Sequence, residues 1–585
     1  MAFRLFAASA ATGFGCGVGS LWRRVAAADS DAAATSSPAT TQQQLDALDT
    51  PASVEPVKLV IVGGGYAGAR TAYQLDSVYN ITLIDTKNYY EATDELTSVI
   101  NGPDDRVAER LEDLHALHRF YLKRARVITN RAVDVDEEHV ILADGRRVPY
   151  DLLVLAPGEK RPYPFAATAR TADVRAAEIK AYRTLLHRKD MHRIAVIGGG
   201  PRGCSFASTL SSICPDKDIH LFHSTGTLTP HFPYETRNRM EHTLDFNPCV
   251  TVHHNSVVTG VRYTNQPSAA VDSIHYVQRK WWHKIAGFFG RGPKQTTQER
   301  QEQLLDETSD AIEQRKAADP AAEKKRLSRH AKAAPAAASA DGSLALEVDY
   351  EAMSAESESP YLDAKFSLDV SLREDTKKEV PSVLFQVYEG DNPKHTVERG
   401  KEIGTETVDD FDMVINCTGN IPNGAAFTNS EFLGPHLDHN GRFVVSKFCQ
   451  LYGGPHMFCV GRSSSIDWVR SMGASDYQAR VLFRNLLSVA NLADNKAPNW
   501  MPTMSPVSQK SLTFPRLIVP MDELQALGST AWTGSVTGPY AQKELTQDRQ
   551  YFLAEMHKPV FYKTLDTAKV RRSVDGWMAS AATDP

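Results

Sequence analysis

Two glycine-rich segments have the residue types and spacing that bind the diphosphate of a dinucleotide. In a G-x-G-x-x-G motif the first glycine permits a tight turn and the second lets the backbone approach a diphosphate. The third lets the following helix pack closely on the strand. The diphosphate then lies at the helix N-terminus. The two segments are Gly63-Gly64-Gly65-Tyr66-Ala67-Gly68 and Gly198-Gly199-Gly200-Pro201-Arg202-Gly203.

The first loop lies between a predicted strand and a predicted helix. Residues 57–62 are nearly all branched and apolar, which is typical of a strand buried in a parallel sheet. Residues 69–75 follow the loop as a helix, and 81–84 form the next strand. Asp85 ends that strand, where a carboxylate can accept hydrogen bonds from an adenosine ribose. Strand, glycines, helix and acid in this order predict a dinucleotide-binding domain.

The second loop repeats this order with one change. Residues 193–197 lead into the glycines, and the next predicted strand, 218–222, ends at His223 instead of an acid. An acid at this position would repel the 2′-phosphate of NADPH, whereas an imidazole neither repels nor strongly attracts it. The second site is therefore predicted to accept NADPH as readily as NADH.

Two later predicted strands close the two domains. Residues 150–155 are followed by Ala156-Pro157-Gly158, and residues 412–416 are followed by Cys417-Thr418-Gly419. Each strand follows its own glycine motif. The sequence therefore predicts an α/β protein with two variations of one Rossmann-like plan.

Composition excludes several other classes of protein. The chain has 585 residues and a net charge of −6, so no overall positive field favours nucleic acid. Seven cysteines without regular spacing argue against a zinc site or a secreted disulfide scaffold. No cysteine lies between residues 56 and 190, which excludes a redox-active cysteine pair in the first domain. The sequence predicts no metal site and names no catalytic residue.

Residues 1–55 are predicted to be a transit peptide and linker. The first 28 residues contain Arg4, Arg23 and Arg24 and no acid, which is typical of mitochondrial import. A signal peptide or a short membrane anchor stays open.

Residues 264–345 are predicted to be a charged insertion. Within it, residues 279–294 combine basic and aromatic side chains without an acid. This segment fits a peripheral membrane contact or, equally, docking on the protein's own surface or on a partner.

The chain resembles the flavoproteins with two dinucleotide-binding domains. Within them it is most similar to the apoptosis-inducing-factor-like, mitochondrion-associated branch (the ferroptosis suppressor proteins), which neighbours the type II NADH dehydrogenases. The matching stretches are Val60 to Gly68, Ile84 to Lys87, Ile219 to Ser224, Cys417 to Gly419, and Phe458 to Gly461.

This resemblance implies a nested architecture. An FAD-binding domain in two parts, 56–160 and 426–495, encloses an NAD(P)-binding domain, 161–425, and a small α+β cap follows at 496–585. In the family such a cap covers the flavin and often forms a dimer or membrane surface, so a homodimer or larger assembly is expected.

The resemblance also carries the family's binding residues onto this chain. The expected FAD contacts are Gly63, Gly65, Gly68, Asp85, Lys87, Gly158 and Gly461, with loop residues Gly64, Tyr66 and Ala67. The expected NAD(P)H contacts are Gly198, Gly200, Gly203, His223 and Gly419. Tyr89, Tyr90 and Glu91 either line the flavin edge or serve in packing.

Three positions depart from the family pattern. Arg462 follows Gly461 where the family has an aspartate that binds the ribityl chain, and a lost contact there costs about 1–3 kcal/mol if buried. Arg462 could instead pair with the diphosphate, with Asp467 replacing the acid. Pro157 and Ser205 replace a threonine and a glutamate of the family.

Two functions follow from these expectations. The first is an FAD-dependent oxidoreductase that passes electrons from NAD(P)H through the flavin to a quinone-like acceptor. The second is a degenerate flavoprotein fold that serves as a structural or nucleotide-sensing subunit of a mitochondrial assembly.

Overall fold

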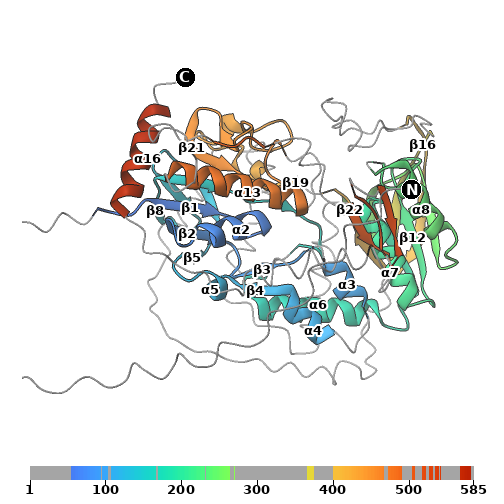
Figure 1. Ribbon diagram of the computed structural model, residues 1–585. Coiled ribbons are helices and arrows are strands. Elements are labelled where there is room, and N and C mark those ends of the chain that lie inside the picture. Colours follow the sequence, from blue (N-terminus) through green and yellow to red (C-terminus); the bar gives the residue numbers. More distant parts are fainter. Residues whose placement is uncertain are drawn as a thin grey trace, which may run out of the picture. The chain divides into compact units, whose positions relative to one another are not determined.

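The computed structural model describes most of the two nucleotide-binding domains and parts of the C-terminal region (Figure 1). The predicted transit peptide, the basic segment 279–294 and Asp467 lie outside the described residues. The described residues are 54–93, 95–102, 107–166, 169–230, 232–263, 269–270, 365–374, 400–419, 421–466, 472–490, 504–507, 517–521, 526–530, 534–538, 541 and 567–581.

The first sheet has six strands in the order β20-β21-β9-β1-β2-β5. Strands β9, β1, β2 and β5 run parallel, and β21 is parallel to β9 although nearly 300 residues separate them. The sheet is thus completed only after the second domain, as a nested fold requires. The strands are β1 (Lys58–Val62), β2 (Asn80–Asp85), β5 (Arg126–Thr129), β9 (Leu152–Leu155), β20 (Gln450–Leu451) and β21 (Gly454–Cys459).

The second sheet has four parallel strands in the order β13-β12-β11-β18. Strands β11 and β12 have the predicted bounds, whereas β9 and β18 begin later than predicted, at Leu152 and Met413. The strands are β11 (Arg193–Ile197), β12 (Asp218–Phe222), β13 (Val250–His253) and β18 (Met413–Asn416). With the first sheet, this confirms the predicted α/β class with two Rossmann-like domains.

A short antiparallel ribbon carries the chain between the two sheets. Strand β10 (Glu159–Lys160) leaves the first sheet, and β19 (Ile421–Pro422) pairs with it on the return. Asn423 stabilises this ribbon. Its backbone N–H donates to the Gly158 carbonyl (3.0 Å), and its Nδ2 donates to the Pro157 carbonyl (2.7 Å). The exact domain boundaries stay a prediction.

Helices follow both glycine loops and cover the sheets. Helix α2 (Tyr66–Leu75) packs against α13 (Met472–Val489), and α16 (Thr567–Ala581) packs against α13 and β21. Helix α7 (Pro201–Ile213) follows the second loop. None of the helices within the described ranges is both long and apolar enough to cross a membrane.

Additional antiparallel sheets accompany the two domains. Strands β6 (Ala132–Val135), β7 (His139–Leu142) and β8 (Arg147–Pro149) form one. Another has the order β15-β14-β16-β17. Its strands are β15 (Ala269–Ala270), β14 (Ser256–Tyr263), β16 (Phe366–Arg373) and β17 (Glu402–Phe411). Strand β15 lies inside the predicted insertion 264–345, so the start of that segment is part of a sheet.

The described part of the C-terminal region is mixed in structure, as predicted. Strands β22 (Leu517–Pro520), β23 (Ala526–Thr530) and β24 (Gly534–Thr537) form an antiparallel sheet, and β22 contacts α7.

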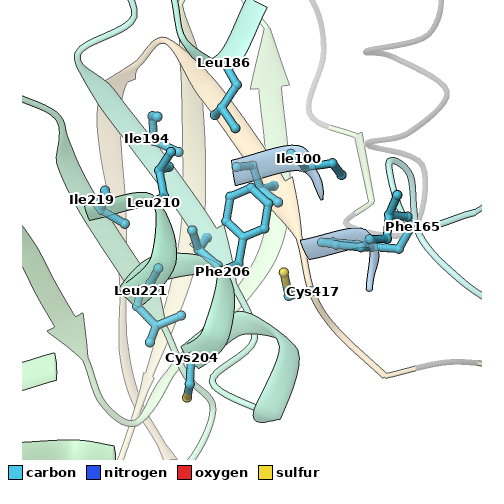
Figure 2. Packing of buried hydrophobic residues seen from close by; sticks show 14 of the residues in the cluster. Ile100, Phe165, Leu186, Ile194, Cys204, Phe206, Leu210, Ile219, Leu221 and Cys417 are labelled. Carbon is cyan, nitrogen blue, oxygen red and sulfur yellow. The ribbon is translucent and has the colours of Figure 1, made fainter. Parts of the chain in front are cut away.

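One hydrophobic cluster joins α7 to its sheet and to helices of the first domain. Figure 2 shows Phe206 and Leu210 of α7 beside Ile194 and Ile219 of the sheet. Phe206 also meets Phe165 edge to face, with ring centroids 5.9 Å apart. The second glycine loop is therefore anchored on a well-packed helix.

His253, on strand β13 of the second sheet, is expected to make the stability of the protein depend on pH. Burial, with His220 and Arg193 nearby, lowers the pKa of His253 to about 4. Because the unfolded chain binds this proton at a higher pH, stability is full above about pH 6.5 and is lost as the pH falls toward 4.

His253→Phe keeps the stacking on Phe222 (centroids 4.4 Å apart) and removes the titrating group. We expect a flatter dependence of the urea unfolding midpoint on pH between 4 and 6.5 than in the wild type. An unchanged slope would show that His253 is not the titrating group.

Candidate dinucleotide-binding sites

The first glycine loop has the geometry that its motif predicts. Gly63 adopts a left-handed φ of +100°, and a Cβ there would lie 2.2 Å from the Ala156 carbonyl oxygen. A Cβ at Gly68 would lie 1.9 Å from the Gly63 carbonyl oxygen. Only glycine fits either position, so the turn and the close packing of α2 both depend on it.

The start of α2 suits a diphosphate. Gly65 is its N-cap, no side chain caps the helix, and its first turn contains no acid. A Cβ at Gly65 would find no atom within 4 Å, so this glycine leaves open space beside the helix start. Uncapped amides beside open space are what an anionic ligand requires.

The second loop repeats this geometry. Gly198 has a φ of +106° and lies against the Cys417 carbonyl, while a Cβ at Gly203 would lie 1.9 Å from the Gly198 carbonyl oxygen. Gly200 is the uncapped N-cap of α7 and has open space where its Cβ would be. Both loops therefore fit a dinucleotide diphosphate.

Two side chains at the start of α7, those of Arg202 and Ser205, pack against the protein or are buried in it. The Arg202 guanidinium lies over the Phe165 ring, 5.0 Å from its centroid. The Ser205 Oγ is buried and has no hydrogen-bond partner among the described residues. Gly419 is exposed and has open space at its Cβ position, which leaves room for a ligand there.

Asp85 lies at the end of β2 beside the first loop, as predicted, and is 9% exposed. Its Oδ2 is 3.3 Å from the Nε2 of His118, and the His118 Nδ1 is 2.6 Å from the Tyr121 hydroxyl. Burial raises the pKa of Asp85, but the His118 hydrogen bond and the Lys87 charge outweigh it and lower the pKa overall. The Asp85 carboxylate is therefore ionised at neutral pH.

His118 is a site residue that sequence reasoning missed. It belongs to the short helix α5 (His118–Tyr121), which follows β4 (His115–Leu117). It lies 33 positions from Asp85, and no motif marks it. The pairing of β4 with β3 (Tyr89–Glu91) returns the chain to the end of β2 and so brings His118 to Asp85.

The structure also explains Gly64, to which the motif assigns no role. A Cβ at Gly64 would lie 2.5 Å from both the Asp85 Oδ2 and the His118 Nε2. The middle glycine of the loop is therefore required by the acid–imidazole pair behind it.

His223 lies against the second loop in a corresponding way. Its Nδ1 accepts a hydrogen bond from the Gly199 N–H (3.1 Å), and its Nε2 is 2.8 Å from the Thr227 carbonyl oxygen. The ring contacts the loop backbone and is 8% exposed. Its part in binding a nucleotide stays a prediction.

The glycines of the later motifs gather at the first loop. Gly461, with a φ of +82°, lies so close to Ala67 that its Cβ would be 3.0 Å from the Ala67 Cβ. The Gly461 N–H donates to the Oε1 of the fully buried Gln478, whose Nε2 is buried and has no partner among the described residues. Gly158 has a φ of +69° with open space at its Cβ position.

Arg462 lies beside the crossing ribbon. Its Nη1 is 4.0 Å from the Oε2 of Glu159, whose side chain is 1% exposed. Glu159 directly follows Gly158 and Arg462 directly follows Gly461, so a carboxylate and a guanidinium approach each other next to two of the expected FAD-binding glycines. The arginine that stands where the family has an aspartate therefore lies close to another acid, Glu159.

A buried ion-pair network follows Asp85 in the chain. The Glu91 Oε2 lies 2.9 Å from the Arg175 Nε and 3.1 Å from the His115 Nε2. Glu91 and Arg175 have side-chain exposures of 0% and 1%. Burial raises the pKa of Glu91, but the Arg175 charge and the His115 hydrogen bond hold it well below its usual range. With Tyr89 and Tyr90 buried as well, these residues serve in packing.

Two buried cysteines lie close to the second loop. Burial raises the pKa of the Cys417 thiol to about 12 and that of Cys204 further, so neither thiol ionises at neutral pH. Within the described ranges no cluster of three or more histidine, cysteine or acidic side chains could hold a metal ion.

Residues 57–300 match the family model described as pyridine nucleotide-disulphide oxidoreductase. The chain is 26% identical over 170 residues to apoptosis-inducing factor homolog B of Dictyostelium discoideum, covering 28% of this chain and 42% of that protein. It is 27% identical over 172 residues to ferroptosis suppressor protein 1 of Mus musculus, covering 29% and 44%. The aligned region thus spans less than half of these relatives.

Two solved structures follow a course of the chain similar to that of this protein. The sulfide:quinone oxidoreductase from Aquifex aeolicus has a TM-score of 0.47 at 14% identity, covering 86% of this chain and 91% of that chain. NDH2 from Plasmodium falciparum in complex with NADH has a TM-score of 0.42 at 11% identity, covering 90% and 98%.

Proposed function

We propose, from the premise that residues 57–300 match the pyridine nucleotide-disulphide oxidoreductase family, that this protein is an FAD-dependent NAD(P)H oxidoreductase. Electrons would pass from NAD(P)H through the flavin to a quinone-like acceptor. The observation that carries the proposal is the duplicated glycine loop, each copy with an uncapped helix start and an open glycine. Two dinucleotide sites in one chain suit one resident cofactor and one exchangeable donor.

The first site is assigned to FAD because three separated motifs converge on it. Gly65 and the start of α2 would hold the diphosphate, and the Asp85 carboxylate would accept from the adenosine ribose. Gly461 lies against Ala67 of the same loop, and the buried Gln478 beside it has an amide group still to be satisfied. A buried unpaired amide is costly, which supports a polar ligand at this point.

The second site is assigned to NAD(P)H. Gly200 and the start of α7 would hold its diphosphate, and Gly419 follows the Cys417 and Thr418 backbone that lies against Gly198. His223 faces the Gly199 backbone and presents no carboxylate at the ribose position. We therefore propose that the site accepts NADPH as readily as NADH.

The flavin, when bound, supplies the hydride chemistry, and this chain's residues bind and orient the two nucleotides. No side chain is required as an acid or base. The thiols of Cys204 and Cys417 are un-ionised, and no cysteine lies between 56 and 190. We propose a small acceptor of the quinone class instead of a disulfide, following the family resemblance.

The setting of this reaction is proposed on the sequence alone. Residues 1–28 would direct the chain to mitochondria, and residues 279–294 would make a peripheral contact with the membrane where quinones reside. A homodimer or larger assembly is expected from the C-terminal cap. The alternative function, a structural or sensing subunit that has lost turnover, is favoured by the Arg462 charge reversal.

An absorption spectrum of the purified protein tests the proposal. We expect a yellow protein whose flavin band is bleached by NADPH without oxygen and restored by a soluble ubiquinone analogue. A bleached band that no quinone restores would support the alternative subunit. A colourless protein that FAD cannot reconstitute would contradict the oxidoreductase.

A further inference from the structure

We propose that His118 is a positioning residue for FAD, which holds the Asp85 carboxylate in the orientation that binds the adenosine ribose. The inference rests on the proposed FAD site. It adds a residue that the glycine motif and the ribose acid do not include. Four observations carry it: the burial of the imidazole, its two hydrogen bonds, the contact with Gly64, and the charges around Asp85.

The imidazole is placed by the backbone. The His118 N–H donates to the Asn88 carbonyl oxygen (3.1 Å), three residues after Asp85. The His118 side chain is fully buried, so its position does not depend on a flexible surface loop. It can therefore act as a fixed partner for the carboxylate.

The two hydrogen bonds of the imidazole link Asp85 to Tyr121. A carboxylate can only accept, so the His118 Nε2–H donates to the Asp85 Oδ2. The Nδ1 of the same ring lies 2.6 Å from the Tyr121 hydroxyl, which can donate to a ring nitrogen or accept from it. Tyr121 is itself 3% exposed. The chain Tyr121–His118–Asp85 is thus a satisfied, buried network.

In this network the Oδ2 of Asp85 is hydrogen-bonded to His118, and the Oδ1 can bind a ligand. The Asp85 Oδ1 is 3.4 Å from the Thr86 hydroxyl, a long contact that a ribose hydroxyl could replace. Gly64 limits movement on the opposite side, since even a Cβ there would lie 2.5 Å from the Oδ2. The carboxylate is therefore held between the glycine loop and the imidazole.

The groups around Asp85 determine the pH at which its carboxylate is protonated. His118, Lys87 and the Thr86 backbone favour the carboxylate, whereas burial opposes it. Tyr89 and Tyr121 also face it and stay protonated, because burial raises the pKa of each phenol. Loss of the His118 hydrogen bond removes the largest of the contributions that lower the pKa of Asp85. The carboxylate would then protonate, and release the ribose, at a higher pH.

The test compares FAD release in His118→Leu, Tyr121→Phe and a surface control. We would measure FAD affinity by quenching of flavin fluorescence and record FAD release as the pH is lowered. For His118→Leu we expect FAD affinity about ten- to a hundredfold weaker, the range of a hydrogen bond to a charged group, and release at a higher pH. Tyr121→Phe keeps the imidazole but removes the hydroxyl that orients it, and we expect a smaller change in the same direction.

The control is His139→Gln, which removes another histidine–aspartate contact, that of His139 Nδ1 with Asp136 Oδ1 at 3.3 Å, away from the loop. It should leave both measurements unchanged. If His118→Leu does not fold, Tyr121→Phe decides the test by its release pH. Wild-type affinity and release pH in the folded variants would overturn the role of His118. A wild-type protein that binds no FAD would instead overturn the proposed function.

Discussion

Gly203→Ala is expected to weaken the reduction of the flavin by NAD(P)H strongly while FAD stays bound. A Cβ at position 203 would lie 1.9 Å from the Gly198 carbonyl oxygen, where contacts shorter than 3.0 Å essentially never occur. Because the neighbouring atom is backbone, α7 and the loop must move apart. Overpacking of this kind costs about 1–3 kcal/mol, and a displaced loop also loses its alignment with the diphosphate. We expect at least about tenfold weaker NADPH binding.

The measurement is the rate of anaerobic flavin bleaching against NADPH concentration, with the flavin content determined separately. Gly200→Ala is the informative partner, because a Cβ there meets no protein atom within 4 Å and should leave folding intact while occupying the space of the ligand. Gly576→Ala in α16, also without a neighbour, is the neutral control. Normal bleaching by the folded Gly203→Ala and Gly200→Ala proteins would place the NAD(P)H site elsewhere.

The second large effect is expected from Arg175→Met. Arg175 and Glu91 form a buried pair at 2.9 Å, and removal of the guanidinium leaves the Glu91 carboxylate without its main counter-charge. Breaking a buried pair from one side costs about 3–5 kcal/mol. Arg175 also donates to the Pro164 carbonyl, so a second acceptor is left unsatisfied. We expect a clear fall in the urea unfolding midpoint.

The double variant Glu91→Gln with Arg175→Met removes the stranded charge and should recover part of this loss. The exposed pair of Arg262 and Asp369 provides a control, with Arg262 half exposed in its side chain. Arg262→Met should change the midpoint little, because surface pairs contribute little to stability. Equal effects of Arg175→Met and Arg262→Met would show that the buried network does not stabilise the fold.

The parts of the fold that could be predicted from sequence are those encoded by neighbouring residues. Strands β11 and β12 have the predicted bounds, because β11 ends where the glycine loop begins and β12 ends directly before His223. The close approaches at Gly63 and Gly203 follow from motif spacing alone. In each case the residues that cause the structure lie within one strand–loop–helix unit.

The rest depends on contacts between distant segments. His118 reaches Asp85 through the pairing of β3 with β4, and nothing in its local sequence distinguishes it from a packing histidine. The Glu91–Arg175 pair and the proximity of Arg462 to Glu159 likewise join segments far apart in the chain. Local patterns predict the loops that approach a ligand, whereas the charges behind those loops emerge only from the tertiary structure.

Strand β21 lies about 300 residues after its neighbour β9 in the sequence, which affects how the first sheet forms during synthesis on the ribosome. Strand β9 is complete at Leu155, but its neighbour β21 ends at Cys459 and pairs with it only then. At about 5–20 residues per second, roughly 15–60 seconds of translation separate the two strands. Strands β11, β12, β13 and β18 are all made within that interval. The second sheet can thus fold while the first still has an open edge at β9, so the first sheet is begun earlier but completed last.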